Sequence, residues 1–246
     1  MIQKLTSLLY TLWVILIFFL IMFLLLPFIL IPFFLGIRFS FISYKFLWLW
    51  AWLFSKLTFI RYRIHGRENI PRDRALIFVS NHTSFLDVPG LRLLIPGEFR
   101  TIAKKELLKI PVFGLIVKAA TVVVDRSDAK SRKKSVELAR SVIEKGISML
   151  IFAEGTQNRT AEILQPFKDG AFRLAIETQT AVVPVVVTGA ARLMPPGTLH
   201  IRPGTISITA GKPIEVNGLQ QNDLPDLKNR TFELMKSMLL NKNSTP

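Results

Sequence analysis

The chain contains no cysteine and only three histidines among its 246 residues. The absence of cysteine excludes disulfide bonds, thiol nucleophiles and cysteine metal ligands. The three histidines, His65, His82 and His200, do not have the spacing of metal ligands. The sequence also lacks a Gly-x-Ser-x-Gly elbow, a phosphate-binding P-loop and a dinucleotide-binding fingerprint. We therefore expect neither a resident metal nor a bound cofactor.

Acidic side chains are scarce as well, because 17 Asp and Glu stand against 32 Lys and Arg, which gives a net charge of +15. The first acidic residue along the chain is Glu68. An excess this large favours an anionic partner, which can be nucleic acid, an anionic membrane surface or a phosphorylated substrate. The apolar N-terminus favours the membrane, and we expect no nucleic-acid partner.

Charge is absent altogether from the beginning of the chain, where no charged side chain occurs between Leu5 and Ile37. Residues 5–26 are nearly all apolar, and as a helix of about 33 Å they would span the hydrocarbon core of a bilayer. A secretory signal peptide is the alternative, but its apolar region should be about 7–15 residues long and end at a small-residue cleavage site. Neither feature is present, so we expect this segment to be retained.

A second apolar segment, Phe39–Phe59, follows Pro27, Pro32 and Gly36, which interrupt the first. It carries lysine, tyrosine and tryptophan side chains, which favour the membrane–water boundary. Two arrangements fit: a full span followed by an interfacial helix, or a helical hairpin embedded from one side. Two core helices of a soluble domain are the alternative, but a helix that is apolar all round is not a surface helix. Basic residues gather after the first segment, which predicts that the remainder lies on the cytosolic side.

From about residue 60 the pattern changes to that of a globular α/β domain, so we expect two domains, residues 1–59 and 60–246. Short apolar segments typical of strands alternate with segments of helical periodicity. The expected strands are residues 62–64, 75–80, 99–103, 121–124, 147–152, 181–187 and 205–209, and the expected helices are residues 84–94, 129–145, 171–177 and 224–240. This alternation predicts a mixed, largely parallel sheet flanked by helices, with a site at the carboxyl ends of its strands.

The segment Asn81–Asp87 follows one expected strand and leads into an expected helix. A histidine at the end of a core strand, five residues before a carboxylate, fits a general base with its orienting acid. On one helix, His82 and Asp87 would point about 140° apart, so the two side chains can meet only if His82 precedes the helix and Asp87 lies in its first turn. Alternatively, Ser84 and Asp87 form a capping box that only closes the helix end. The spacing alone leaves the two interpretations even.

Further polar segments also follow expected strands. Phe152–Arg159 contains a glycine among hydrogen-bond donors, which suits an anion such as a phosphate, although an ordinary polar loop has the same composition. Arg126 stands just past a strand and could clamp a phosphate or be a solvated charge. The basic run Lys130–Lys134 opens an expected helix and fits either anionic headgroups or a solvated face.

Together these segments resemble the motifs of the glycerolipid acyltransferases, specifically the bacterial 1-acylglycerol-3-phosphate acyltransferases. The matching blocks are His82 to Asp87 (His-x4-Asp), Lys104 to Leu107 (Lys-x-Glu-Leu), Arg126 as the strand-end arginine, Glu154-Gly155-Thr156 followed by Pro166-Phe167-Lys168 and Gly170, and Val183-Pro184-Val185. The match covers roughly residues 60–215. The family's third block usually reads Phe-Pro-Glu-Gly-Thr-Arg-Ser, and here Ala153, Gln157 and Asn158 replace its proline, arginine and serine.

The resemblance implies acyl transfer from a thioester, acyl-CoA or acyl-carrier protein, to the sn-2 hydroxyl of 1-acylglycerol-3-phosphate, which gives phosphatidic acid. It implies that His82 takes the hydroxyl proton and that Asp87 fixes the imidazole tautomer and stabilises the imidazolium. The residues expected to bind the acceptor are Lys104, Lys105, Arg126, Glu154, Gly155, Thr156, Arg159 and Lys168. The implied partners are the lysophospholipid, the thioester donor and membrane lipids, with the catalytic domain on the cytosolic face of the inner (cytoplasmic) membrane.

Two other functions remain open at this point. One is acyl transfer to a different lysolipid, such as a lyso-ornithine lipid, because Gln157 lacks the charge of the family's arginine. The other is a non-enzymatic protein that uses its basic surface to bind anionic lipid or nucleic acid. The intact pair of His82 and Asp87 argues against the second.

Overall fold

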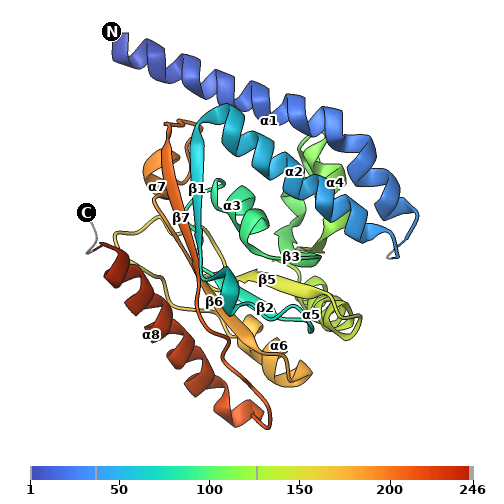
Figure 1. Cartoon of the computed structure of the whole chain (residues 1–246). Helices are drawn as coiled ribbons and strands as arrows, with labels where there is room; N and C mark the ends of the chain where they lie inside the picture. The colour runs from blue at the N-terminus through green and yellow to red at the C-terminus, as the bar shows by residue number, and fades with distance from the viewer. Residues whose placement is uncertain (1, 37, 126, 244–246) are drawn as a thin grey trace. The chain divides into compact units, whose positions relative to one another are not determined.

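A computed structural model describes residues 2–36, 38–125 and 127–243 of the chain (Figure 1). The strands are β1 (Ile60–His65), β2 (Ile77–Ser80), β3 (Phe99–Lys104), β4 (Thr121–Val124), β5 (Ser148–Phe152), β6 (Val182–Thr188) and β7 (Gly204–Ala210). The α-helices are α1 (Ile2–Phe34), α2 (Ser40–Thr58), α3 (Asp87–Leu94), α4 (Phe113–Ala120), α5 (Ala129–Glu144), α6 (Gly170–Thr178), α7 (Ala190–Leu193) and α8 (Leu224–Asn243). Short 3-10 helices are η1 (Arg67–Asn69), η2 (Lys105–Lys109) and η3 (Gln221–Asp223).

The strands of the described chain form one seven-stranded sheet in the order β1-β7-β6-β2-β5-β3-β4. β2 pairs in parallel with β5 and β6, and β3 pairs in parallel with β4 and β5. An isolated antiparallel bridge joins Val182 and Ile214. The mixed, largely parallel sheet predicted from the sequence is therefore confirmed. Every expected strand lies within two residues of an observed one.

The described chain divides into two compact units. Unit 1 comprises residues 1–65, 83–97 and 187–208, and unit 2 comprises residues 66–82, 98–186 and 209–246. The division passes through β6 and β7, so it does not test the domain boundary expected at residue 60, which stays a prediction.

Unit 1 begins with a hairpin of α1 and α2 (Figure 1). Ser43 Oγ of α2 donates to the Ile29 carbonyl of α1 at 2.7 Å, and the Tyr10 hydroxyl of α1 donates to the Thr58 carbonyl at 2.5 Å. These bonds join the helices at both ends of the hairpin. α2 in turn contacts α3 and β1.

α1 continues to Phe34, so the prediction that Pro27 and Pro32 interrupt it is wrong. Each proline removes only its own amide donor and kinks a helix more readily than it stops one when the surroundings favour helix. Figure 1 shows α1 bending along its last turns. The predicted second helix, Phe39–Phe59, differs from α2 by one residue at each end.

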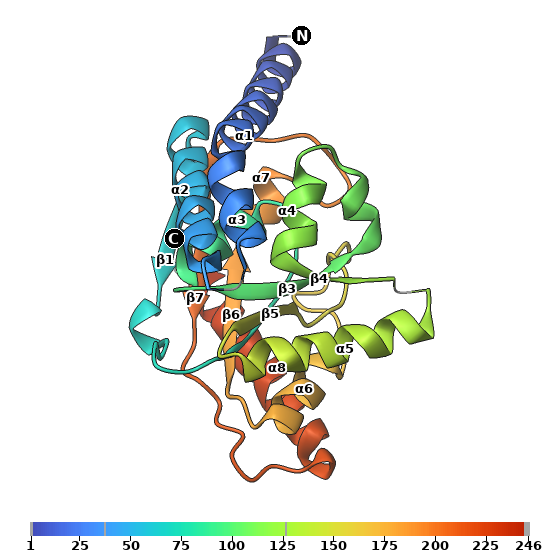
Figure 2. The same ribbon diagram turned by 90° about the vertical axis from the view of Figure 1, so that its right-hand side faces the viewer.

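Unit 2 places α4 on one face of β3 and β4 and places α5, α6 and α8 on the other face of the strands (Figure 2). β2, β5 and β6 have strands on both sides, so their side chains are almost all buried, as in central parallel strands. The core includes the fully buried side chains of Ile77, Met149, Phe172, Leu227 and Met235.

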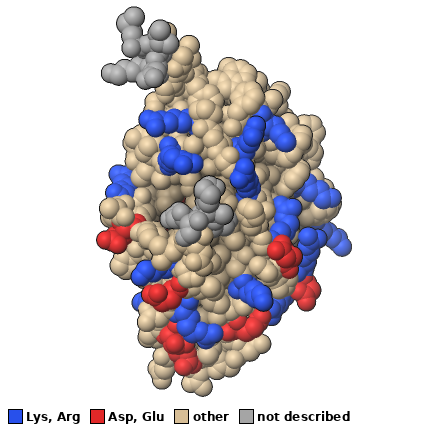
Figure 3. Space-filling view, turned by 60° about the vertical axis from the view of Figure 1, so that its left-hand side comes forward, with Lys and Arg blue, Asp and Glu red and all other residues tan. Residues whose placement is uncertain are grey.

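Two short helices, α4 and α7, were not expected from the sequence. α4 reads FGLIVKAA and α7 has only four residues, so neither is long enough to establish helical periodicity. Basic side chains spread over the face of the molecule drawn in Figure 3, with fewer acidic ones among them, as the net charge requires.

Replacement of Gly90 by alanine should destabilise unit 1. A Cβ at Gly90 would lie 2.1 Å from Ile208 Cδ1 and 2.6 Å from a ring carbon of Tyr62, which is far inside van der Waals contact. We expect Gly90→Ala to lower the free energy of unfolding by about 1–3 kcal/mol, because an overpacked site must shift its neighbours. Thermal unfolding in detergent measures this, with Gly170→Ala, where no atom lies within 4 Å, as the control. Equal melting temperatures for the two variants would contradict the prediction.

Candidate active site

His82 lies on the loop that follows β2 at the carboxyl end of the sheet. Its backbone is held on both sides by the loop that follows β5. The His82 amide donates to Glu154 Oε1 at 3.0 Å, and the Asn158 amide donates to the His82 carbonyl at 2.7 Å. β2 and β5 are parallel neighbours with Ser80 beside Phe152, so the residues that follow the two strands meet.

The imidazole of His82 stacks on the ring of Phe152, with ring centroids 4.0 Å apart and an interplanar angle of 21°. Phe152 is the last residue of β5, so the sheet itself positions the surface on which the imidazole rests. His82 is half-buried, which leaves part of the side chain accessible. The anchored backbone and the stacked ring together fix the position of a potential proton acceptor.

Asp87 begins α3 and is fully buried. Its Oδ2 accepts hydrogen bonds from the Thr83 amide at 2.7 Å and from the Ser84 amide at 2.9 Å. Ser84 Oγ accepts from the Leu86 amide at 3.2 Å. Of the expected capping box, the bond from the Ser84 amide to the Asp87 carboxylate is present, but Ser84 Oγ accepts the Leu86 amide where a capping box requires the Asp87 amide. The expected placement, with His82 before the helix and Asp87 in its first turn, is confirmed as well.

Tyr62 of β1 supports the turn before α3, because its hydroxyl donates to the Leu86 carbonyl at 3.0 Å. Burial raises the pKa of Tyr62 well above its usual value, and the negative charge of Asp87 raises it further. The phenol therefore stays protonated and remains a hydrogen-bond donor at physiological pH. Its ring packs against Gly90, which leaves room for it on α3.

Glu154 is buried, and backbone amides donate to both oxygens of its carboxylate. Oε1 accepts from His82, as described above, and Oε2 accepts from the Gln165 amide at 2.8 Å. Gly155 follows with a φ of +75°, a conformation that glycine adopts without strain. Glu154 therefore connects the start of the loop after β5 both to His82 on the loop after β2 and to Gln165 farther along its own loop.

Asn158 shapes the next part of this loop. Its Oδ1 accepts from the Thr160 amide at 2.9 Å, and its Nδ2 donates to the Glu162 carbonyl at 2.9 Å. The side chain is buried, so these bonds fix the turn that also carries the Asn158 amide to His82. Among the described residues, the neighbouring amide nitrogen Nε2 of Gln157 is buried and has no hydrogen-bond partner.

Cationic side chains border the same edge of the sheet. Lys104 ends β3 and is exposed, and Arg159 and Lys168 are exposed on the loop after β5. Lys105 forms an ion pair with Asp125, which raises the pKa of Lys105 and lowers that of Asp125 to about 2. These groups make the edge attractive to an anion.

Comparison with known proteins decides the family. The family model described as acyltransferase matches residues 61–188 of this chain. The chain belongs to this family. His82, Asp87, Glu154 and the loop that follows Glu154 all lie within the matched residues.

The chain is similar to proteins of known name. It is 36% identical over 150 residues to the 1-acyl-sn-glycerol-3-phosphate acyltransferase of Cocos nucifera, which covers 60% of this chain and 48% of that protein. It is 30% identical over 189 residues to 1-acyl-sn-glycerol-3-phosphate acyltransferase beta of Homo sapiens, which covers 76% of this chain and 68% of that protein. The chain thus spans about half the length of the coconut relative.

A solved structure has the same fold. The crystal structure of the 1-acyl-sn-glycerophosphate (LPA) acyltransferase PlsC from Thermotoga maritima superposes with a TM-score of 0.81. The two chains are 25% identical, and the match covers 99% of this chain and 98% of that one. The fold of this chain is therefore the fold of that enzyme.

The structure brings together some of the site residues predicted from the sequence. Within unit 2, the backbone of His82 lies at the loop that carries Glu154, Gly155, Thr156, Arg159 and Lys168. Lys104 ends the neighbouring strand β3 and Lys105 follows it, and Arg126 lies outside the described residues. Their roles in substrate binding stay predictions. Sequence reasoning missed Phe152, Asn158 and Gln165 as supports of the site, because their partners are set by strand pairing and not by local spacing.

Replacement of Glu154 by glutamine should loosen the loop that anchors His82. Glutamine keeps one acceptor but turns an amide donor toward a backbone N–H, so one of the two bonds is lost in a buried place. We expect Glu154→Gln to lower the free energy of unfolding by about 1–3 kcal/mol. Hydrogen–deuterium exchange should become faster at the amides of His82 and Gln165.

The control is Glu162→Gln, because Glu162 lies on the same loop and its side chain is exposed. Exchange rates at His82 and Gln165 that stay as slow in Glu154→Gln as in this control would show that the carboxylate does not hold the loop.

Proposed function

We propose that this acyltransferase transfers a fatty acyl group from a thioester donor to the sn-2 hydroxyl of 1-acylglycerol-3-phosphate, which yields phosphatidic acid. The observation that carries the proposal is the anchoring of His82 at the carboxyl end of β2, with its amide on Glu154 and its ring on Phe152. The acceptor is supported by the names of the relatives, which are 1-acyl-sn-glycerol-3-phosphate acyltransferases in coconut and human and a 1-acyl-sn-glycerophosphate (LPA) acyltransferase in Thermotoga maritima.

In the proposed mechanism His82 is the general base. Its imidazole takes the proton of the acceptor hydroxyl as that oxygen attacks the thioester carbonyl, and the thiolate leaves when the tetrahedral intermediate collapses. Asp87 orients the imidazole and stabilises the imidazolium. Asp87 can keep its orientation because the amides of Thr83 and Ser84 hold its carboxylate. No covalent enzyme intermediate is required, which suits a chain without cysteine.

The acceptor phosphate is assigned to the cationic edge of the sheet. Lys104, Arg159 and Lys168 are exposed there and can reach an anion without breaking an ion pair. Arg126 is assigned to the same phosphate from the sequence resemblance. Glu154 acts mainly through the backbone that it holds, because both of its oxygens already accept hydrogen bonds.

A different lysolipid acceptor is the second candidate, because Gln157 is uncharged where the family usually has arginine. The buried Nε2 of Gln157 can donate a hydrogen bond to a neutral acceptor group as well as to a phosphate. A panel of lysolipid acceptors with phosphate, zwitterionic and lyso-ornithine headgroups separates the two candidates. The proposed function requires the highest kcat/KM with 1-acylglycerol-3-phosphate.

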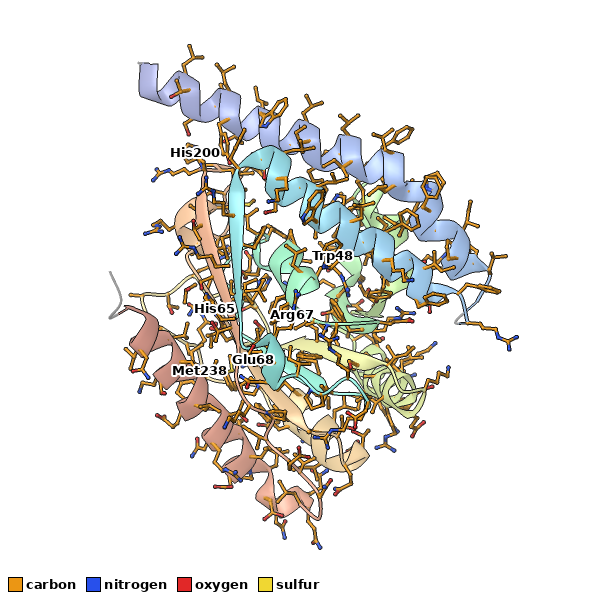
Figure 4. All side chains as sticks on the ribbon, in the orientation of Figure 1. Trp48, His65, Arg67, Glu68, His200 and Met238 are labelled. Atoms are coloured by element: carbon orange, nitrogen blue, oxygen red, sulfur yellow. The ribbon has the colours of Figure 1, made fainter. Side chains whose placement is uncertain are left out.

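His82→Ala should abolish acyl transfer and leave membrane association unchanged. Loss of a general base lowers turnover by about a hundredfold to ten-thousandfold. The measurement uses enzyme reconstituted in liposomes, labelled acyl-CoA and chromatographic separation of the products. His65→Ala is the matched control, because His65 is exposed at the end of β1 (Figure 4) and should transfer normally. Near-normal transfer by purified His82→Ala would remove the general-base assignment.

The protein associates with a membrane through α1, whose residues Leu5–Phe34 form the described helix that is long and apolar enough to cross one. We propose that it instead lies in the membrane from one side. Ser7 near its start is hydrogen-bonded to His200 (Figure 4), and Thr11 exchanges hydrogen bonds with the backbone of Ile201. Near its other end, Ile29 accepts a bond from Ser43.

Contacts along most of its length tie α1 to the rest of unit 1, which suits a hairpin embedded in one leaflet better than a helix that leaves the protein to cross the bilayer. The opposite side of α1 presents apolar side chains to the lipid. They include Leu9, Leu16, Leu20, Phe23, Leu24 and Ile31, which are all exposed. In this arrangement we propose that the globular part faces the cytosol from the inner membrane.

Single cysteines at Thr6 and Arg38 should be labelled from the same side of the membrane as a cysteine at Lys236. The chain has no native cysteine, so each variant reports one position. A membrane-impermeant maleimide applied to sealed inside-out and right-side-out vesicles gives the measurement. Labelling of Thr6→Cys from the side opposite to Lys236→Cys would establish that α1 spans the membrane.

A further inference from the structure

The start of α1 is bonded to the loop between α7 and β7, residues 194–203. Ser7 Oγ is hydrogen-bonded to the ring of His200, with 3.0 Å between Oγ and Nε2 (Figure 4). Thr11, one turn further along α1, accepts the Ile201 amide at 3.1 Å, and both of these residues are buried. The loop and α1 belong to the same unit of the structure. The loop therefore lies directly against the helix that associates with the membrane.

The tip of this loop exposes a large apolar side chain. Leu199 directly precedes His200 and is 68% exposed, more than any described leucine of α1. The turn before it is stiffened by Pro195 and Pro196, and the Thr198 amide donates to the Pro195 carbonyl at 3.2 Å. The loop thus presents Leu199 from a fixed backbone, one residue away from the contact with α1.

The end of α2 brings two more exposed apolar side chains to the same part of α1. The Tyr10 hydroxyl donates to the Thr58 carbonyl, and Trp13 Nε1 donates to the Leu57 carbonyl at 3.0 Å. Leu57 and Phe59 are both exposed. Tyrosine and tryptophan are the side chains that favour the membrane–water boundary. The same two turns of α1 that bind the loop therefore also bind the end of α2.

The exposed charge of unit 1 has one sign. The sequence of this unit contains a single acidic residue, Asp87, and Asp87 is fully buried. Arg192 of α7 and Arg202 of the loop are exposed. The Arg202 amide donates to the Leu193 carbonyl at 2.8 Å, which brings the two arginines to adjacent stretches of backbone. No exposed carboxylate of unit 1 competes for them, so they are suited to an anionic partner.

An anionic bilayer surface fits these features better than the other anionic partners. Apolar side chains beside cations match the boundary between acyl chains and anionic headgroups. A nucleic acid or a free phosphate would leave Leu199 and Phe59 in water. An acidic protein could cover both kinds of side chain, but it would have to dock beside exposed leucines of α1 that already face the lipid.

We infer that the loop of residues 194–203 is a second membrane-binding element. Leu199 enters the leaflet beside the start of α1, and Arg192 and Arg202 bind the headgroups of anionic phospholipids. Leu57 and Phe59 at the end of α2 complete this interfacial surface. The inference rests on the membrane association of α1, and it adds the part of the globular chain that touches the bilayer and the class of lipid that it recognises.

A fluorescent label on a single cysteine measures the insertion of Leu199. The chain has no native cysteine, so Leu199→Cys carries one nitrobenzoxadiazole group. The labelled full chain is reconstituted in vesicles of equal amounts of phosphatidylcholine and phosphatidylglycerol, in which part of the lipid has a nitroxide near the headgroup end of its acyl chain. We expect at least about twofold quenching, because interfacial elements lie about 5–10 Å into the boundary of headgroups and acyl chains.

Two further labels in unit 1 give the reference values. His65→Cys lies at the end of β1 away from α1 (Figure 4) and should stay unquenched. Leu9→Cys lies on the exposed side of α1 and should be quenched. Quenching at Leu9 without quenching at Leu199 would overturn the inference and leave the association of α1 standing. Absence of quenching at both positions would overturn the two together.

The headgroup contact is tested by changing the lipid that carries the nitroxide. With the label at position 199, nitroxide-phosphatidylglycerol should quench severalfold more strongly than nitroxide-phosphatidylcholine, because arginines near the surface attract anionic lipid. Arg192→Gln with Arg202→Gln should bring the ratio of the two toward one. The control, Lys145→Gln with Lys236→Gln, removes the same charge at exposed positions of unit 2 and should keep the ratio. An unchanged ratio in the arginine variant would overturn the headgroup contact.

An acidic protein is the remaining alternative for this surface. A label at position 199 that stays unquenched in vesicles but responds to added acyl-carrier protein would assign the surface to that protein and overturn the membrane contact. Acyl transfer enters none of these measurements, so they hold whichever lysolipid the enzyme accepts. Circular dichroism verifies that each variant is folded, and every substituted side chain is exposed.

Discussion

One buried carboxylate holds the site together. Glu154 lies two residues past the end of β5 and accepts the amides of His82 and Gln165, so a charge that would be costly to bury alone is satisfied by two backbone donors. Through these bonds the loop after β2 and the far part of the loop after β5 become one rigid piece. The position of the His82 backbone therefore depends on Glu154, together with the bond from the Asn158 amide.

The fold was predictable because each strand is a short apolar run bounded by polar or helical sequence, and the alternation leaves little freedom in topology. The site was predictable where the chemistry is local. Helix geometry shows that His82 and Asp87 can meet only if His82 precedes the helix, and α3 does begin at Asp87. The stack of His82 on Phe152 and the bond from Asn158 were not predictable, because they arise from the parallel register of β2 and β5.

The N-terminal helices show the same division between local and long-range information. Composition identified both apolar segments. The two prolines predicted that α1 would end before Phe34, and this is wrong because packing against α2 outweighs the loss of two amide donors. Whether α1 crosses a membrane depends on contacts such as that between Ser7 and His200, which are 193 residues apart. The residue pattern within α1 cannot predict a contact with a residue so far along the chain.

Three residues of the loop after β5, Ala153, Gln157 and Asn158, differ from those usual in the family's third block, and the structure shows what two of them do. Ala153 has an amide that proline would lack, and this amide donates to the Ser80 carbonyl at 3.1 Å, which extends the pairing of β2 and β5 by one residue. Asn158 uses a longer side chain than serine to bond both Thr160 and Glu162. Both substitutions thus stiffen the loop that anchors His82. Gln157 has no charge where the family usually has arginine, so under the proposed function the acceptor phosphate would depend on the remaining cations, Arg159 among them.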